Sequence, residues 1–158
     1  MLPFFVYGTL RPGLHNHARH LGGRCLRSRP AVLGGAVLHD GPGYPYAVRD
    51  PDPRRLVHGE LLTVRPADYA RVLAELDELE ECRPDDSGLY VRLRLPVRPT
   101  GGAATATGSE GLAGPAGPVE DAWVYLAGPA QAEYLRAHPS PIPSGDWTTH
   151  LAGTPERP

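Results

Sequence analysis

The chain has 158 residues, 41% of them hydrophobic, and a formal net charge of -2 at pH 7. The nearly balanced charge argues against a nucleic-acid partner, and no apolar stretch approaches the roughly 20 residues of a membrane-spanning helix. All 16 basic residues are arginine, which indicates GC-rich coding, so we expect a bacterial, cytoplasmic protein of one domain with no nucleic-acid or membrane partner.

The first expected element is a strand over 3–7, where β-branched and aromatic residues form a short apolar run. The run ends at Gly8, a residue that lets the backbone bend or lets another group come close to it. Turn-rich segments separate several further strands. These are expected at 31–38, 56–64, 89–97 and 122–126.

A helix is expected to begin near Pro66 and to run through Glu80. At about 100° per residue, Leu73, Leu76 and Glu80 fall on one apolar stripe. The glutamates that should face water instead are Glu75, Glu78 and Glu81. Two interpretations of Glu80 stay open: either the helix ends early and leaves it in solvent, or its carboxyl lies in a partly dry cavity. In a cavity, its pKa would be raised to a value suited to proton transfer.

The rest of the chain adds a second, shorter helix at 130–138. Residues 100–117 are rich in Gly, Ala, Thr and Pro without an apolar period, which predicts a mobile hairpin loop. We interpret 144–147 as a packed turn without chemistry and expect 153–158 to fray. The pattern therefore indicates one α+β domain over 1–152, with a β-barrel-like core and a few packed helices.

Two residue types, cysteine and histidine, could support redox or metal chemistry in this chain. Neither Cys25 nor Cys82 lies in a CxxC motif, so the sequence allows one disulfide or two free thiols, and a reducing cytoplasm favours the thiols. His15, His17 and His20 form an HxHxxH pattern, but no nearby carboxylate or cysteine completes a metal-binding set. We interpret them as surface histidines and expect no metal site.

Three segments match, in order, the motifs of a known family: YGTLR at 7–11, LDELE at 76–80 and YVR at 90–92. On these residues the chain resembles the γ-glutamylcyclotransferase-like family, which includes the AIG2-like proteins and the γ-glutamylamine cyclotransferases. The resemblance extends from Val6 to about Leu126 and implies that family's α+β barrel. One position departs from the pattern, because Glu81 stands where the family usually has a glycine able to form a left-handed helix cap.

The resemblance implies an enzyme that cleaves a γ-glutamyl amine or amide and releases 5-oxoproline and the free amine. Glu80 matches the family's catalytic acid/base. Amide N–H groups exposed at a strand end also suit an anion or oxyanion. No metal or cofactor is implied, because nucleophile and electrophile share one molecule. The residues implied to bind the substrate are Tyr7, Gly8, Thr9, Leu10, Tyr90 and Tyr125.

Some alternatives remain open from the residues alone. Tyr90 and Tyr125 suit core packing as well as a pocket wall, and Arg92 suits an ion pair with Asp77 as well as a ligand contact. A hypothesis of another class is a non-catalytic member of the fold that binds a small acidic metabolite or a protein partner. The enzyme hypothesis requires the Glu80 carboxyl and the loop amides to share one cavity. A monomer or weak dimer is expected.

Overall fold

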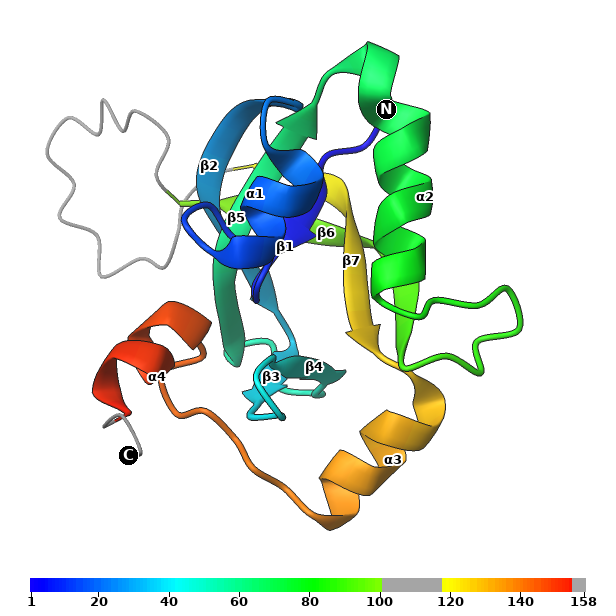
Figure 1. Ribbon diagram of the computed structural model, residues 1–158. Helices are drawn as coiled ribbons and strands as arrows, with labels where there is room; N and C mark the ends of the chain where they lie inside the picture. The colour runs from blue at the N-terminus through cyan, green and yellow to red at the C-terminus, as the bar shows by residue number, and fades with distance from the viewer. Residues whose placement is uncertain (101–117, 155–158) are drawn as a thin grey trace, which may run out of the picture.

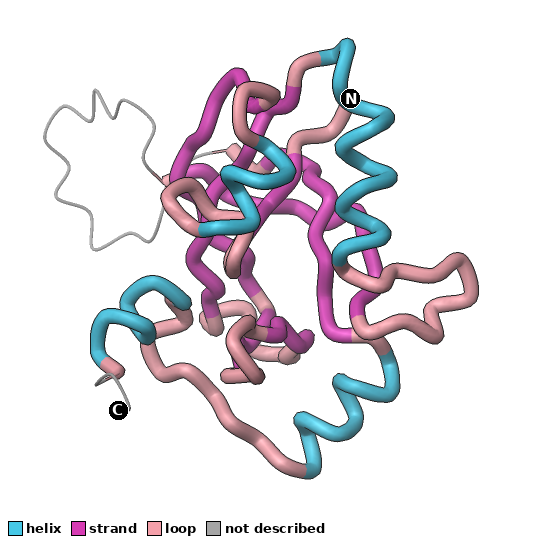
Figure 2. Tube along the Cα trace, in the orientation of Figure 1, coloured by secondary structure: helices cyan, strands magenta, loops and turns pink. Residues whose placement is uncertain are grey.

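The computed structural model describes residues 1–100 and 118–154 (Figure 1). Its helical and extended segments follow one another in a mixed order, as Figure 2 shows by colour. The strands are β1 (Phe4–Val6), β2 (Cys25–Gly34), β3 (Ala36–His39), β4 (Tyr46–Arg49), β5 (Leu56–Val64), β6 (Tyr90–Pro99) and β7 (Glu120–Ala127). The helices are α1 (His15–Leu21), α2 (Tyr69–Leu79), α3 (Pro129–Ala137) and α4 (Trp147–Gly153), and a short 3₁₀ turn, Pro66–Asp68, leads into α2.

Five strands form a closed barrel in the order β1-β5-β2-β6-β7. The barrel closes where β1 pairs with β7 in parallel, with Phe4 opposite Trp123, and its other pairings are antiparallel. Closure leaves no open sheet edge among these strands. The predicted α+β barrel with packed helices is therefore confirmed.

The expected strand at 31–38 is wrong in one respect, because it is two strands. Gly35 has a φ of 72°, a left-handed conformation that breaks the extended backbone between β2 and β3. β3 then pairs with β4 in a separate two-stranded sheet. The sequence pattern missed β4, a four-residue strand, and the arginine-rich first half of β2.

The long helix was placed nearly correctly. Pro66 opens the 3₁₀ turn, α2 follows from Tyr69, and the helix ends at Leu79, one residue before the predicted end. The second expected helix corresponds to α3. The short helices α1 and α4 were not predicted, and the three histidines of the HxHxxH pattern lie in α1.

Two apolar clusters hold these elements together. Consecutive residues of β1 alternate between them: Phe5 belongs to the first, while Phe4 and Val6 belong to the second. The first cluster contains inward-facing residues of the barrel, among them Phe5, Leu61, Val97 and Val124. The second joins the outer face of the barrel to the helices, through Leu21 of α1, Val72 and Leu76 of α2 and Leu135 of α3. α2 consequently lies along the barrel beside β1 and β7 (Figure 1).

Cys25 and Cys82 are free thiols. Of the expected loop at 100–117, residues 101–117 lie outside the described residues, as do 155–158, whereas Gly153 is the last residue of α4. β6 and β7, which flank the first of these segments, pair with each other. No helix in the described ranges is long and apolar enough to cross a membrane.

Candidate active site

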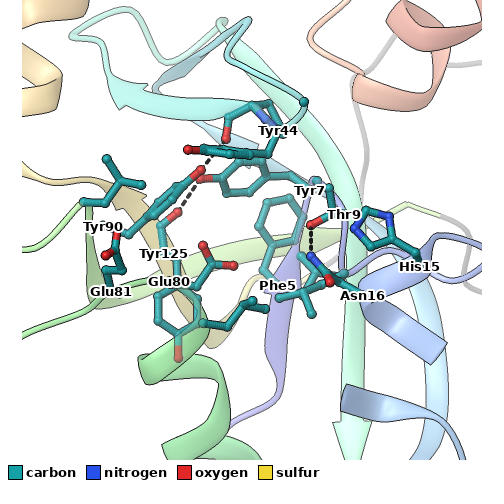
Figure 3. Close-up of a pocket in the computed structure, with 17 residues that line it drawn as sticks. Phe5, Tyr7, Thr9, His15, Asn16, Tyr44, Glu80, Glu81, Tyr90 and Tyr125 are labelled. Atoms are coloured by element: carbon teal, nitrogen blue, oxygen red, sulfur yellow. Dashed lines mark hydrogen bonds between the residues drawn. The ribbon is translucent and has the colours of Figure 1, made fainter. Parts of the chain in front are cut away.

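A pocket of about 290 Å³ opens at the end of the barrel where β1 and α2 finish (Figure 3). It gathers segments from five parts of the chain: the end of β1 with its loop, the start of α1, the loop before β4, the segment from the end of α2 into β6, and β7. All seven residues expected at the site line it, namely Tyr7, Gly8, Thr9, Leu10, Glu80, Tyr90 and Tyr125. The condition that Glu80 and the loop share one cavity is therefore met.

The loop after β1 turns sharply, because the Arg11 N–H donates to the Gly8 carbonyl oxygen at 3.1 Å. Side chains of α1 fix the turn from outside: Asn16 Nδ2 donates to Thr9 Oγ1 at 2.8 Å, and His17 Nδ1 lies 2.9 Å from the Leu10 carbonyl oxygen. Within the described residues, no acceptor takes a hydrogen bond from the N–H groups of residues 8–10. These amides are free to bind an anion or a developing oxyanion.

The bare backbone of Gly8 has a packing reason. A Cβ added to Gly8 would lie 2.9 Å from Pro45 Cδ and 3.0 Å from Pro45 Cγ, closer than side-chain carbons pack. The Gly8 loop and the Pro45 loop thus touch across the mouth of the pocket. Gly8 therefore allows another group to come close to the backbone, and that group is the Pro45 ring.

Glu80 is the residue directly after α2, and its N–H still donates to the Leu76 carbonyl oxygen at 2.9 Å. The helix does end early, yet the half-buried Glu80 side chain points into the space beside Tyr7 and Tyr90 (Figure 3). No cation among the described residues pairs with it. Burial raises the pKa of this carboxyl from 4.5 to about 7, so it is ready both to accept and to donate a proton near neutral pH.

Three tyrosines form the aromatic wall of the pocket, and each has its hydroxyl engaged by the protein. The Tyr7 hydroxyl donates to the Tyr125 carbonyl oxygen. The Tyr90 hydroxyl donates to the Pro45 carbonyl oxygen at 2.8 Å, and the Tyr125 hydroxyl donates to Asp77 Oδ1 at 2.6 Å. Burial raises the pKa of all three hydroxyls well above their ordinary value. They are neutral at physiological pH, and they shape the pocket without adding charge.

Arg92 stands behind this wall and does not line the pocket. Its Nε lies 2.9 Å from Asp77 Oδ1, the same oxygen that accepts the Tyr125 hydroxyl. Its guanidinium carbon lies 4.4 Å from the centre of the Trp123 ring. Of the two roles open for Arg92, the structure shows the ion pair with Asp77. Asp77 in turn connects Arg92 to the pocket through the Tyr125 hydroxyl.

Several pocket residues were not named as site residues from the sequence: His15, Asn16, Tyr44 and Glu81. Tyr44 and Pro45 come from a Gly-Tyr-Pro stretch that carried no assigned role, and only the folded chain brings it to Gly8. Glu81 has a φ of 49°, the left-handed conformation that a glycine would adopt freely. In the described part of the chain, no three His, Cys, Asp or Glu side chains lie close enough to hold a metal ion.

The chain thus combines a closed barrel, a carboxyl at a helix end and a loop with free amides. Comparison with known proteins identifies the class of protein to which this combination belongs. A sequence model described as "Gamma-glutamyl cyclotransferase, AIG2-like" matches residues 4–149. The chain belongs to this family.

Individual proteins share only a minority of their aligned residues with this chain. Gamma-L-glutamyl-butirosin B gamma-glutamyl cyclotransferase from Niallia circulans is 37% identical over 100 residues, which are 62% of this chain and 59% of that protein. The match thus spans about three fifths of the length of that relative. The crystal structure of an AIG2-like protein from Mus musculus aligns with a TM-score of 0.55 at 25% identity, over 83% of this chain and 82% of that chain. YkqA from Bacillus subtilis shares the fold, with a TM-score of 0.61 at 20% identity, over 95% of this chain and 40% of that chain.

Proposed function

We propose that this protein is a γ-glutamyl cyclotransferase, which cleaves a γ-glutamyl amine or amide into 5-oxoproline and the free amine. The observation that carries the proposal is the placement of Glu80. A carboxyl with a pKa of about 7 shares one cavity with three amides that have no acceptor among the described residues. Family membership and the cyclotransferase relative from Niallia circulans support the same activity.

The first step prepares the nucleophile. The substrate's α-amine is protonated at neutral pH and cannot attack until it loses a proton. The Glu80 carboxylate accepts that proton, and its raised pKa makes the transfer less unfavourable than it would be for an ordinary glutamate. The pocket holds the glutamyl group folded back, so that the amine lies against its own γ-carbonyl carbon.

The second step exchanges one carbon–nitrogen bond for another. The amine attacks the γ-carbonyl carbon, a five-membered ring closes, and the carbonyl electron pair becomes an oxyanion, which the free amides of the Gly8 to Leu10 loop stabilise. Glu80 then donates its proton to the leaving nitrogen. The carbonyl reforms as the original amide bond breaks, and the ring nitrogen gives its extra proton to Glu80. Glu80 passes this proton to the released amine or to water and is again a carboxylate for the next turnover. The nucleophile and electrophile belong to one molecule, so we propose that no cofactor takes part.

The experiment is a direct assay for 5-oxoproline with a panel of γ-L-glutamyl amides. The wild-type protein should release 5-oxoproline from at least one of them. Glu80→Gln keeps the shape of the side chain but cannot transfer the proton, and general acid–base catalysis contributes roughly 100- to 10,000-fold. Because one group serves every proton transfer in this mechanism, the loss should lie at the top of this range.

The matched control is Glu78→Gln, an exposed position in the last turn of α2 that does not line the pocket. This variant should keep its turnover. Full turnover in Glu80→Gln would contradict the mechanism. Tight binding of a γ-glutamyl compound without release of 5-oxoproline would favour the non-catalytic alternative.

A further inference from the structure

The amides of the Gly8 to Leu10 loop can stabilise an oxyanion only if they keep one orientation. Their own hydrogen bonding does not fix them, because among the described residues they donate to no acceptor. The bond from the Arg11 N–H to the Gly8 carbonyl oxygen closes the turn but leaves the two residues between them, Thr9 and Leu10, to be held by other groups. The orientation of the amides therefore depends on what contacts the Thr9 side chain and the Leu10 carbonyl.

Two consecutive side chains of α1 make these two contacts. Asn16 Nδ2 donates to Thr9 Oγ1 at 2.8 Å (Figure 3), and His17 Nδ1 lies 2.9 Å from the Leu10 carbonyl oxygen. A carbonyl oxygen only accepts, so the His17 Nδ1 carries a proton and donates it. Both side chains are half-buried. Thr9 is thus held through its side chain and Leu10 through its main chain, each by a donor from α1.

The far end of α1 is fixed to the helix that leads to the catalytic carboxyl. Leu21, the last residue of α1, is fully buried and belongs to the same apolar cluster as Leu76 of α2. Just beyond it, Arg24 Nη1 donates to Glu75 Oε2 of α2 at 2.8 Å. Glu80 directly follows α2. α1 therefore connects the loop that carries the amides to the helix that places the proton-transfer group.

We infer that Asn16 and His17 are positioning residues of the reaction, which orient the loop amides toward the forming oxyanion and transfer no proton themselves. The inference rests on the proposed function and adds α1 to its machinery. Interactions made only in the transition state affect kcat and leave KM unchanged. A misplacement of about 1 Å in a reacting geometry can cost roughly 100-fold, so the loss of either contact should lower kcat by about 10- to 100-fold.

The first test asks whether Asn16 acts through Thr9. Asn16→Leu keeps the side-chain volume and removes the donor, and Thr9→Val keeps the shape and removes the acceptor. Each should lower kcat for 5-oxoproline release by about 10- to 100-fold, with KM for the same amide within about threefold of wild type. Because the two residues share one hydrogen bond, the double variant should be no slower than Thr9→Val alone. Losses that multiply in the double variant would overturn the assignment.

The second test uses a conservative exchange at His17. The side-chain nitrogen of asparagine can take the place of Nδ1 in histidine, so His17→Asn should keep kcat close to wild type. His17→Leu, which has no donor, should lose about 10- to 100-fold. Arg19→Gln is the control, an exposed position on α1 that does not line the pocket, and it should change neither kcat nor KM. Equal losses in His17→Asn and His17→Leu would overturn the role of the donor.

Amide NMR spectra separate this inference from the proposed chemistry. In Asn16→Leu and His17→Leu the Thr9 and Leu10 amide signals should shift, while signals of residues in α2 stay in place. Normal kcat in both variants would overturn the inference and leave the cyclotransferase activity standing. Absence of 5-oxoproline release by wild type would overturn the proposed function. The spectra then decide the inference, because unchanged loop signals would reject it and displaced loop signals would retain α1 as the element that orients these amides.

Discussion

Arg11 and Asp146, 135 positions apart in the chain, form an ion pair of 2.7 Å between Nη1 and Oδ1. Arg11 is only 9% exposed, and its Nε also donates to Glu60 Oε2 of β5 at 2.7 Å. Asp146 is the N-cap of α4, where it accepts from the Thr148 N–H at 3.0 Å. The residue that follows the pocket loop is thus tied both to the barrel and to the last helix.

The first prediction concerns this buried ion network. Arg11→Met fills a similar volume but leaves Glu60 and Asp146 without their cation. Removing one partner of a buried ion pair typically costs about 3–5 kcal/mol, so the free energy of unfolding measured in urea should fall by about that much. As a control, Arg94→Met removes one side of the exposed pair with Asp121 and should leave the urea midpoint unchanged. A stable Arg11→Met protein would show that the network adds little to the fold.

The second prediction concerns the contact between Gly8 and Pro45. Gly8→Ala places a methyl group 2.9 Å from Pro45 Cδ and pushes away the loop whose carbonyl oxygen accepts from Tyr90. We expect a loss of stability of about 1–3 kcal/mol, as is usual for overpacking, together with a lower kcat. Gly153→Ala is the control, because a Cβ there meets nothing within 4 Å. Unchanged stability and turnover in Gly8→Ala would mean that the Pro45 loop shifts freely.

The third prediction follows from the raised pKa of Glu80. Its pKa in the folded protein is about 7, above the ordinary 4.5, so between these values the folded state binds more protons than the unfolded state. The free energy of unfolding therefore falls as pH rises through this window, by at most about 3 kcal/mol. Glu80→Gln removes this term. Its melting temperature should exceed that of wild type by a small amount at pH 5 and by a larger amount at pH 8.

The same titration should govern catalysis. The carboxylate form accepts the first proton, so kcat/KM of the wild-type protein should rise with pH and level off above about 7. A profile that levels off near pH 4.5 would indicate a glutamate in contact with water. An equal gain in the melting temperature of Glu80→Gln at both pH values would point to the same conclusion.

The fourth prediction concerns the strained backbone at Glu81. A left-handed conformation costs a residue with a side chain roughly 1–2 kcal/mol relative to glycine. Glu81→Gly should therefore raise the free energy of unfolding by about 1 kcal/mol. Glu78→Gly, inside the helix, should instead lower it by about 1 kcal/mol, the helix-propensity cost of glycine. A loss of stability in Glu81→Gly would show that its side chain contributes more than the strain costs.

Local patterns in the sequence were enough to predict much of this fold. The apolar runs gave β1, β5, β6 and β7, and the stripe through Leu73 and Leu76 gave α2, because strand and helix periods are set by the backbone itself. The apolar pattern did not show that the expected strand at 31–38 is broken, because a glycine such as Gly35 can also occur within a continuous strand. Nor did it reveal α4, whose seven residues are fixed by the Asp146 cap and by burial of Trp147.

For the site, the sequence by itself was enough to predict which residues line the pocket. The YGTL loop, Glu80, Tyr90 and Tyr125 were named from the family resemblance, the helix phase also singled out Glu80, and all of them line the pocket. The tertiary structure decided what surrounds them. The pKa of Glu80 depends on burial, which arises only when α2 ends against the barrel. The approach of Pro45 to Gly8, the link from Arg92 through Asp77 to Tyr125, and the position of Glu81 at the pocket edge all join segments distant in sequence. Such contacts depend on how elements pack in three dimensions, and no local pattern encodes them.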